Sequence, residues 1–159
     1  MIIGIISDTH DNMPAMQRAV KVLTERRVEH VIHAGDFCSP FTFRALKHLK
    51  CDFTGIYGNN DGERLLLQKL SNSRIYTQPH ILELAGKKIV IMHEHHVVVA
   101  LADSNHFDLI VYGHTHTPDI RKQGNTLIVN PGELGGWLYG KSTMAIADLS
   151  TMSAELIEI

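Results

Sequence analysis

The sequence predicts an α/β fold in which two packed β-sheets carry helices on their outer faces. In the first half of the chain, β-branched runs alternate with segments of helical periodicity, and crossover helices of this kind imply a parallel sheet. In the second half, short apolar runs separated by turn residues imply mostly antiparallel hairpins, and therefore a mixed or second sheet. The length of 159 residues suits one domain, which we expect to span residues 1–159.

Strands and helices alternate in the first half. Strands are expected at 2–6, 31–32 and 53–57, because these runs are rich in β-branched or aromatic residues. Helices are expected to follow each strand. Asn12 can cap the first helix, with Pro14 in its first turn.

Pro40 is expected to open the second helix, with Phe41 on its apolar face, and 63–70 is expected to form the third. The second half reads differently, as hairpins with one short helix. Its expected elements are a hairpin of 81–84 with 88–92, a helix at 97–102, strands at 109–112 and 126–129, and a closing hairpin of 143–149 with 154–159.

Charge, apolar runs and cysteine content narrow the classes of function. The net charge of -2 gives no reason to expect non-specific nucleic-acid binding, and we expect no specific nucleic-acid partner. No apolar run approaches the length of a membrane span, and the N-terminal run has neither the length nor the basic start of a signal peptide. Cys38 and Cys51 suggest two free thiols in a reducing compartment. We therefore expect a cytoplasmic protein that does not associate with membranes.

Six short motifs follow the predicted strand ends in order. They are Asp8-Thr9-His10, Gly35-Asp36, Gly58-Asn59-Asn60-Asp61, Met92-His93-Glu94-His95, Gly113-His114-Thr115-His116 and Asn130-Pro131-Gly132. An extended backbone would send the side chains of Asp8 and His10 to one face, and those of His114 and His116 likewise. The first five motifs therefore predict a cluster of carboxylate, amide and imidazole groups.

This set of donors indicates metal ions and phosphate chemistry. Mixed nitrogen and oxygen ligands without thiolate suit Mn²⁺, Fe, Ni²⁺ or Zn²⁺, and argue against a structural zinc site. Seven donors exceed the needs of one ion, so we expect two ions roughly 3.5–4 Å apart that share a carboxylate. Two divalent ions bring more positive charge than the carboxylates of Asp8 and Asp36 cancel. The remaining charge can hold a phosphate and can acidify a bridging water to a pKa near ~7.

The order of these motifs resembles the calcineurin-like metallophosphoesterases, above all their small bacterial and archaeal phosphodiesterase branch. The resemblance extends from Asp8 to Gly132. It implies a four-layer αββα sandwich of two mixed β-sheets flanked by helices. It also implies a dinuclear metal-dependent phosphodiesterase, in which a metal-bridging hydroxide attacks the phosphorus of a small phosphodiester in line.

The resemblance carries the ligand set over residue by residue. The implied ligands of the first ion are Asp8, His10, Asp36 and His116. Those of the second ion are the bridging Asp36 together with Asn59, His93 and His114. Mn²⁺ is the expected metal, with Ni²⁺, Fe, Zn²⁺ or Mg²⁺ as alternatives.

Three residues are expected to act on the substrate or to support the site. Asn59 is expected to touch the phosphate. Asp61 is expected to accept a hydrogen bond from an imidazole, that of His10 by preference. His95 is expected either to contact the phosphate or to form only a local hydrogen bond. Glu94 replaces the usual glycine, which leaves open whether His93 or His95 binds metal, although His93 ends the strand.

Other positions depart from the pattern of the family. Asn60 stands where many larger relatives have a histidine, and an amide cannot protonate a leaving group, so good leaving groups are favoured. Glu133 stands where a small residue is usual, and we expect it to repel or select anionic substrates. The segment 135–141 forms either a loop over the site or a glycine-rich turn that places Trp137 at an edge or interface.

Two rival functions follow from the same resemblance. One is a non-catalytic scaffold, since a eukaryotic retromer subunit with a similar fold serves mainly as a binding surface. The complete ligand set favours catalysis over this alternative. The other is a phosphomonoesterase, which the amide of Asn60 disfavours. Relatives of this branch also suggest a homo-oligomer, for which Trp137 or the expected hairpin of 81–84 with 88–92 is a candidate contact.

Overall fold

A computed structural model describes residues 1–159. The first half of the chain contributes most strands of a six-stranded sheet, whose strand order is β11-β10-β1-β2-β3-β4. β1 pairs in parallel with β2, and β2 with β3, as the crossover helices require. β10 pairs antiparallel with β1 and with β11, which confirms the closing hairpin. The strands are β1 (Ile2–Ile6), β2 (His30–His33), β3 (Asp52–Ile56), β4 (Ile75–Tyr76), β10 (Thr143–Asp148) and β11 (Ser153–Glu158).

The middle of the chain forms a five-stranded sheet with the order β5-β6-β7-β9-β8. β6 pairs in parallel with β7, and β7 with β9, while the two outer pairs are antiparallel. The second sheet is therefore mixed, and our expectation of mostly antiparallel pairing was wrong for its centre. Its strands are β5 (His80–Leu84), β6 (Lys87–Ile91), β7 (Leu109–Val111), β8 (Asp119–Gln123) and β9 (Thr126–Asn130).

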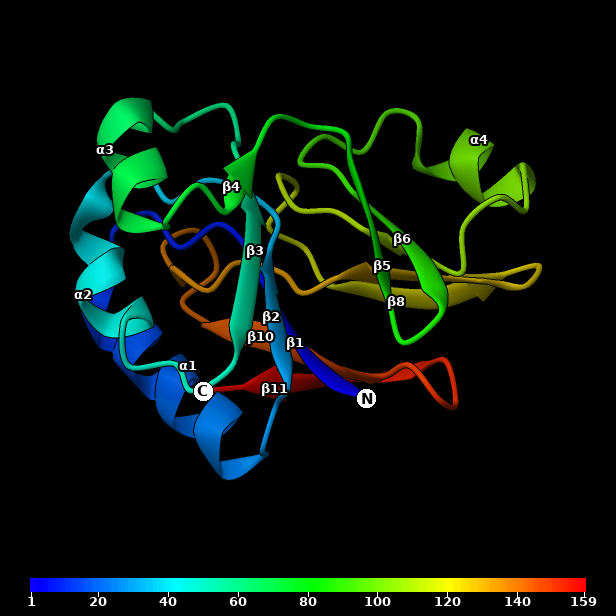
Figure 1. The fold of residues 1–159 in the computed structure, drawn as a ribbon, viewed down its shortest axis with the longest axis horizontal. Coiled ribbons are helices and arrows are strands. Elements are labelled where there is room, and N and C mark those ends of the chain that lie inside the picture. The colour runs from blue at the N-terminus through cyan, green and yellow to red at the C-terminus, as the bar shows by residue number, and fades with distance from the viewer.

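The helices lie on the two outer faces of the paired sheets (Figure 1). α1 (Met13–Glu25), α2 (Phe43–Leu46) and α3 (Arg64–Leu70) lie on the side of the first sheet, and α4 (Val98–Asp103) on the side of the second. The expected cap of α1 is confirmed, because the Asn12 side chain accepts a hydrogen bond from the Ala15 backbone N–H at 3.1 Å. No helix of the chain has the length and apolar character needed to cross a membrane.

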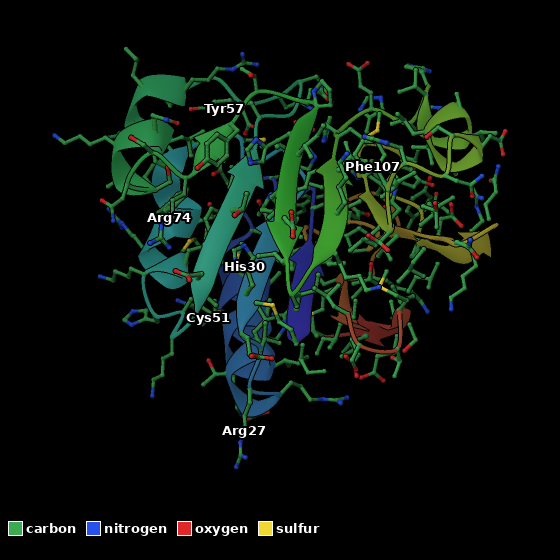
Figure 2. The ribbon with its side chains drawn as sticks, turned by 45° about the vertical axis from the view of Figure 1, so that its right-hand side comes forward. Arg27, His30, Cys51, Tyr57, Arg74 and Phe107 are labelled. Carbon is green, nitrogen blue, oxygen red and sulfur yellow. The ribbon has the colours of Figure 1, made fainter.

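Three hydrophobic clusters separate the four layers. The first joins α1, α2 and α3 to the six-stranded sheet, and the second fills the space between the sheets with aliphatic residues. The third packs α4 on the five-stranded sheet. Its Phe107 lies between the β5–β6 hairpin and α4 in Figure 2. The predicted four-layer αββα sandwich is confirmed, and burial of its inner faces fixes which way each strand turns its side chains.

Local expectations differ from the structure at the periphery. Residues 40–42 form a 3₁₀ turn before α2, and Phe41 is 55% exposed rather than part of an apolar face. β4 and β8 were not predicted. β4 has only two residues, and β8 reads Asp-Ile-Arg-Lys-Gln, which lacks the apolar signal of a strand because it lies at a sheet edge.

Candidate metal centre

The predicted ligands sit in loops at the carboxyl ends of parallel strands. The loop after β1 carries Asp8 and His10, and its backbone donates to the loop after β2 through Asp8 N to Gly35 O (3.0 Å) and His10 N to Asp36 O (3.1 Å). The loops after β6 and β7 carry the histidines from the second sheet. The site therefore straddles the two sheets, as expected for ligands at neighbouring strand ends.

The backbone brings these side chains together by a different route from the one we expected. Asp8 and His10 have φ values of 51° and 40°, and His114 and His116 have 69° and 59°. Asp36 is also left-handed, at 61°. The extended conformation assumed for the paired motifs was therefore wrong, since left-handed residues turn the chain sharply and aim successive side chains into one space.

Two glycines allow the loops to approach closely. A Cβ atom at Gly113 would lie 2.0 Å from Ser7 Oγ and 2.7 Å from Asp8 Oδ2. A Cβ atom at Gly58 would lie 2.2 Å from Asp36 Oδ1. Glycine at these positions is therefore a steric requirement of the site.

Asp8, His10 and His116 form one group of donors. His116 Nε2 lies 3.4 Å from Asp8 Oδ1 and 3.4 Å from His10 Nε2. His116 Nδ1 donates to Glu133 Oε2 at 3.1 Å, which leaves the Nε2 lone pair directed toward Asp8 and His10. This arrangement could hold one metal ion.

A second group forms around Asp36. Its Oδ2 atom lies 3.4 Å from His93 Nε2 and 3.6 Å from His10 Nε2, so one carboxylate reaches both groups. Asn59 Oδ1 lies 2.9 Å from His93 Nε2 and 3.0 Å from His114 Nδ1. The structure thus brings all seven predicted ligands together, with Asp36 between the two groups.

His93, rather than His95, points into this centre. The His93 ring is fully buried, and its Nδ1 donates to the Ala34 carbonyl at 2.8 Å, so Nε2 faces Asp36 and Asn59. His95 is exposed, with its ring centroid 6.1 Å from that of His114. His95 therefore stands at the rim of the centre.

The electrostatics of the centre suit cations. Asp8 Oδ1 is buried without a hydrogen-bond donor, and burial raises the pKa of this carboxyl. Burial also acts to raise the pKa of Asp36, but the neighbouring His93 imidazole and the hydrogen bonds from Asn60 hold it well below its usual range. Burial lowers the pKa of His93, but the Asp36 and Asp8 carboxylates raise it overall. Lone pairs of oxygen and nitrogen thus converge, and divalent ions fit this donor set.

The expected role of Asp61 is wrong. Its buried carboxylate accepts three backbone N–H groups, from Asp36 (3.1 Å), Cys38 (2.8 Å) and Gly58 (2.7 Å), and no imidazole. The Nδ1 atom of His10 instead lies 3.1 Å from Cys38 Sγ. Asp61 therefore fixes the backbone of the loops that carry the centre, because the left-handed turn after β2 directs its N–H groups toward this side chain.

Two supporting residues escaped prediction. Asn60 donates to both oxygens of Asp36, from its backbone N–H at 2.8 Å and its amide at 2.7 Å. Glu133 is 1% exposed and accepts from His116 and from three backbone N–H groups of the following loop. Glu133 is thus buried against His116 and fully engaged by the protein, which differs from our expectation of a group that acts on substrates. Their polar positions within the motifs were visible in the sequence, but their partners were not.

Comparison with known proteins agrees with this geometry. The family model of the calcineurin-like phosphoesterase superfamily domain matches residues 1–152, and the chain belongs to this superfamily of phosphoesterases. Within it, the chain is 37% identical over 154 residues to a phosphodiesterase of Methanocaldococcus jannaschii, covering 93% of each chain. The resemblance read from the six motifs is therefore confirmed.

Solved structures give the same result. An archaeal phosphodiesterase described as novel has a TM-score of 0.92 at 35% identity, with 100% of both chains covered. The Zn²⁺ complex of Vps29 from Entamoeba histolytica has a TM-score of 0.74 at 18% identity, covering 100% of this chain and 98% of that one. The second likeness shows the shared fold.

Proposed function

We propose that the protein is a dinuclear metal-dependent phosphodiesterase that acts on small phosphodiesters. The observation that carries this proposal is the position of the buried Asp36 carboxylate, whose Oδ2 atom lies 3.6 Å from His10 Nε2 and 3.4 Å from His93 Nε2. The relative from Methanocaldococcus jannaschii, named a phosphodiesterase, supports the choice of reaction. The proposed ligands are Asp8, His10, Asp36 and His116 for one ion, and Asp36, Asn59, His93 and His114 for the other.

Two bound divalent ions supply Lewis acidity and an acidified water for attack on phosphorus. The chain itself orients the ligands. Asn60 and Asp61 fix the carboxylate and backbone of Asp36, and Ala34 and Glu133 each hold one histidine through its Nδ1–H. Mn²⁺ is the metal that we propose, since nitrogen and oxygen donors without thiolate suit it.

Residues at the open side of the centre would meet the substrate. We propose that the amide of Asn59 and the imidazole of His95 contact the phosphate, because Asn59 joins His93 to His114 and His95 stands beside His114. Asn60 cannot supply a proton, and its amide is engaged by Asp36. Aryl diesters should therefore react faster than alkyl diesters, and equal rates would argue against this account.

The test begins with Mn²⁺-loaded protein and a bis-aryl phosphate. Elemental analysis should find two ions per chain, and a chelator should abolish hydrolysis. Asp36→Asn should lose both metal and activity, whereas Asp52→Asn, at an exposed carboxylate far from the centre, should keep both. A single ion, or hydrolysis that survives in Asp36→Asn, would reject the dinuclear mechanism. A phenyl monoester assayed beside the diester should react more slowly, which separates a phosphodiesterase from a phosphomonoesterase.

We further propose that residues 1–159 act as one metallophosphoesterase domain, in the cytoplasm and without specific nucleic-acid binding. The free thiols of Cys38 and Cys51 and the net charge of -2 support these assignments. A homo-oligomer is the proposed assembly, and sedimentation of the metal-loaded protein would test it.

A further inference from the structure

One loop at the edge of the metal centre is held in place by the centre itself. This loop, residues 135–139, follows Glu133, whose carboxylate accepts the backbone N–H groups of Trp137, Leu138 and Tyr139 at 2.9–3.0 Å. The same carboxylate accepts from His116 Nδ1. The loop is therefore tied directly to one proposed ligand of the first ion.

Trp137 is tied to a second part of the centre. Its indole N–H donates to the His10 carbonyl at 3.1 Å, while the His10 ring reaches to 3.6 Å from Asp36 Oδ2. The indole also packs on Gly135, where a Cβ atom would lie 2.9 Å from Trp137 Cδ1 and 3.0 Å from the Asp8 carbonyl. Two contacts thus place the indole beside the loop that carries Asp8 and His10.

The fixed indole is nevertheless open to solvent. Trp137 is 64% exposed, although its only polar atom is already satisfied by His10. An aromatic side chain of this size is normally buried, and an exposed one held rigidly at the edge of a site is a binding surface rather than part of the core. Its exposed apolar face lies beside the loop that carries Asp8 and His10.

We propose that Trp137 is a specificity-determining residue that stacks on a planar aromatic ring carried by an ester group of the substrate. The substrates would then be aryl or nucleoside phosphodiesters rather than dialkyl ones. This inference rests on the proposed function, since it assumes that the phosphate binds at the metal centre. Stacking suits this position because it needs only a flat face and tolerates different rings.

Ligand binding tests the inference, because the chain has a single tryptophan and its fluorescence reports on this residue alone. Mn²⁺-loaded protein is titrated with two matched pairs, adenosine 5′-monophosphate against ribose 5-phosphate and phenyl phosphate against methyl phosphate. Excitation at the red edge of tryptophan absorption avoids the probes. The ringed member of at least one pair should quench fluorescence and bind more tightly. Equal quenching and affinity within both pairs would overturn the proposal.

Variants separate the ring from the loop. Trp137→Leu should weaken binding of the ringed probe about 5- to 150-fold by calorimetry, the range that stacking of one ring provides, and should leave its ringless partner within about twofold. Leu138→Ala, at a neighbouring residue with 65% exposure, is the matched control and should change neither. Unchanged affinities in Trp137→Leu would overturn the inference. So would a changed oligomeric state with unchanged affinities, because it would assign this face to a second copy of the chain.

These outcomes are distinct from failure of the proposed function. Ring-dependent binding lost in Trp137→Leu would support the inference even if the wild-type protein hydrolysed no diester. Conversely, hydrolysis of diesters with no preference for ringed ligands would support the proposed phosphodiesterase function and reject the stacking role of Trp137.

Discussion

Replacing Asp61 by asparagine tests how the loops of the centre are held. The carboxylate accepts three backbone N–H groups with two oxygens, from Asp36, Cys38 and Gly58. An amide has one oxygen, so in either orientation its NH₂ group faces at least one backbone N–H. A hydrogen bond to a charged acceptor contributes about 1.5–3 kcal/mol, and a buried unpaired donor costs about 1–3 kcal/mol. We expect Asp61→Asn to lower the free energy of unfolding by about 2–4 kcal/mol.

Metal affinity should fall as well, by about 10- to 100-fold, because groups that orient ligands commonly contribute this much. Urea unfolding of the metal-free protein measures the first effect, and calorimetric Mn²⁺ titration of folded protein measures the second. Asp52→Asn serves as the control, since its exposed pair with Arg74 contributes at most about 1 kcal/mol. If Asp61→Asn is as stable as the wild-type protein, the three hydrogen bonds do not hold the loops, and our reasoning fails.

Three further outcomes are expected. Glu133→Gln tests the contribution of the Glu133 carboxylate to stability. Burial acts to raise the pKa of this carboxyl, but its hydrogen-bond donors, above all the Tyr139 N–H, lower the pKa overall below 4.5. The stabilisation by the carboxylate is therefore present above the unfolded pKa and is lost as pH falls through the lower folded pKa. The melting temperatures of variant and wild type should therefore converge on acidification, and a gap independent of pH would contradict this. Asn60→Ala removes one hydrogen bond to Asp36 and should weaken Mn²⁺ binding about fivefold by calorimetry; unchanged affinity would mean that the amide is dispensable. Mn²⁺ at 100 times its Kd should stabilise the fold by about 2.7 kcal/mol per site, as thermal melting with and without chelator can show, and Asp36→Asn should abolish the shift.

The sequence predicted the parts of the fold that depend on local pattern. The β-branched run of β1, the cap at Asn12 and the polar motifs at strand ends can each be recognised from a few adjacent residues. β8 could not be found in this way, because its pairing with β9 overrides a charged and weakly apolar segment. The parallel pairing of β7 with its neighbours was also hidden, since only three residues form the strand.

The side chains that gather at the centre were predictable from the sequence, and the residues that support them were not. Each proposed ligand belongs to a motif of a few residues. The partners that tie the supports to the centre lie far away in the sequence: His116 is 17 positions from Glu133, and Cys38 and Asp36 are 23 and 25 positions from Asp61. The wrong assignment of His10 to Asp61 shows the difference. Residue type indicated that an acid supports the site, but only the backbone geometry shows that its donors are amides.

The left-handed backbone at the ligands sets opposing demands on how this sequence can change over generations. Each non-glycine residue in that conformation costs roughly 1–2 kcal/mol, and Asp8, His10, Asp36, His114 and His116 all adopt it. Glycine at any of the five would relieve the strain and remove a donor. Selection for stability alone would therefore favour glycine at these positions, as it would at the other non-glycine residues with positive φ. Holding five donors in this conformation therefore lowers the stability of the fold in exchange for a compact group of oxygen and nitrogen atoms.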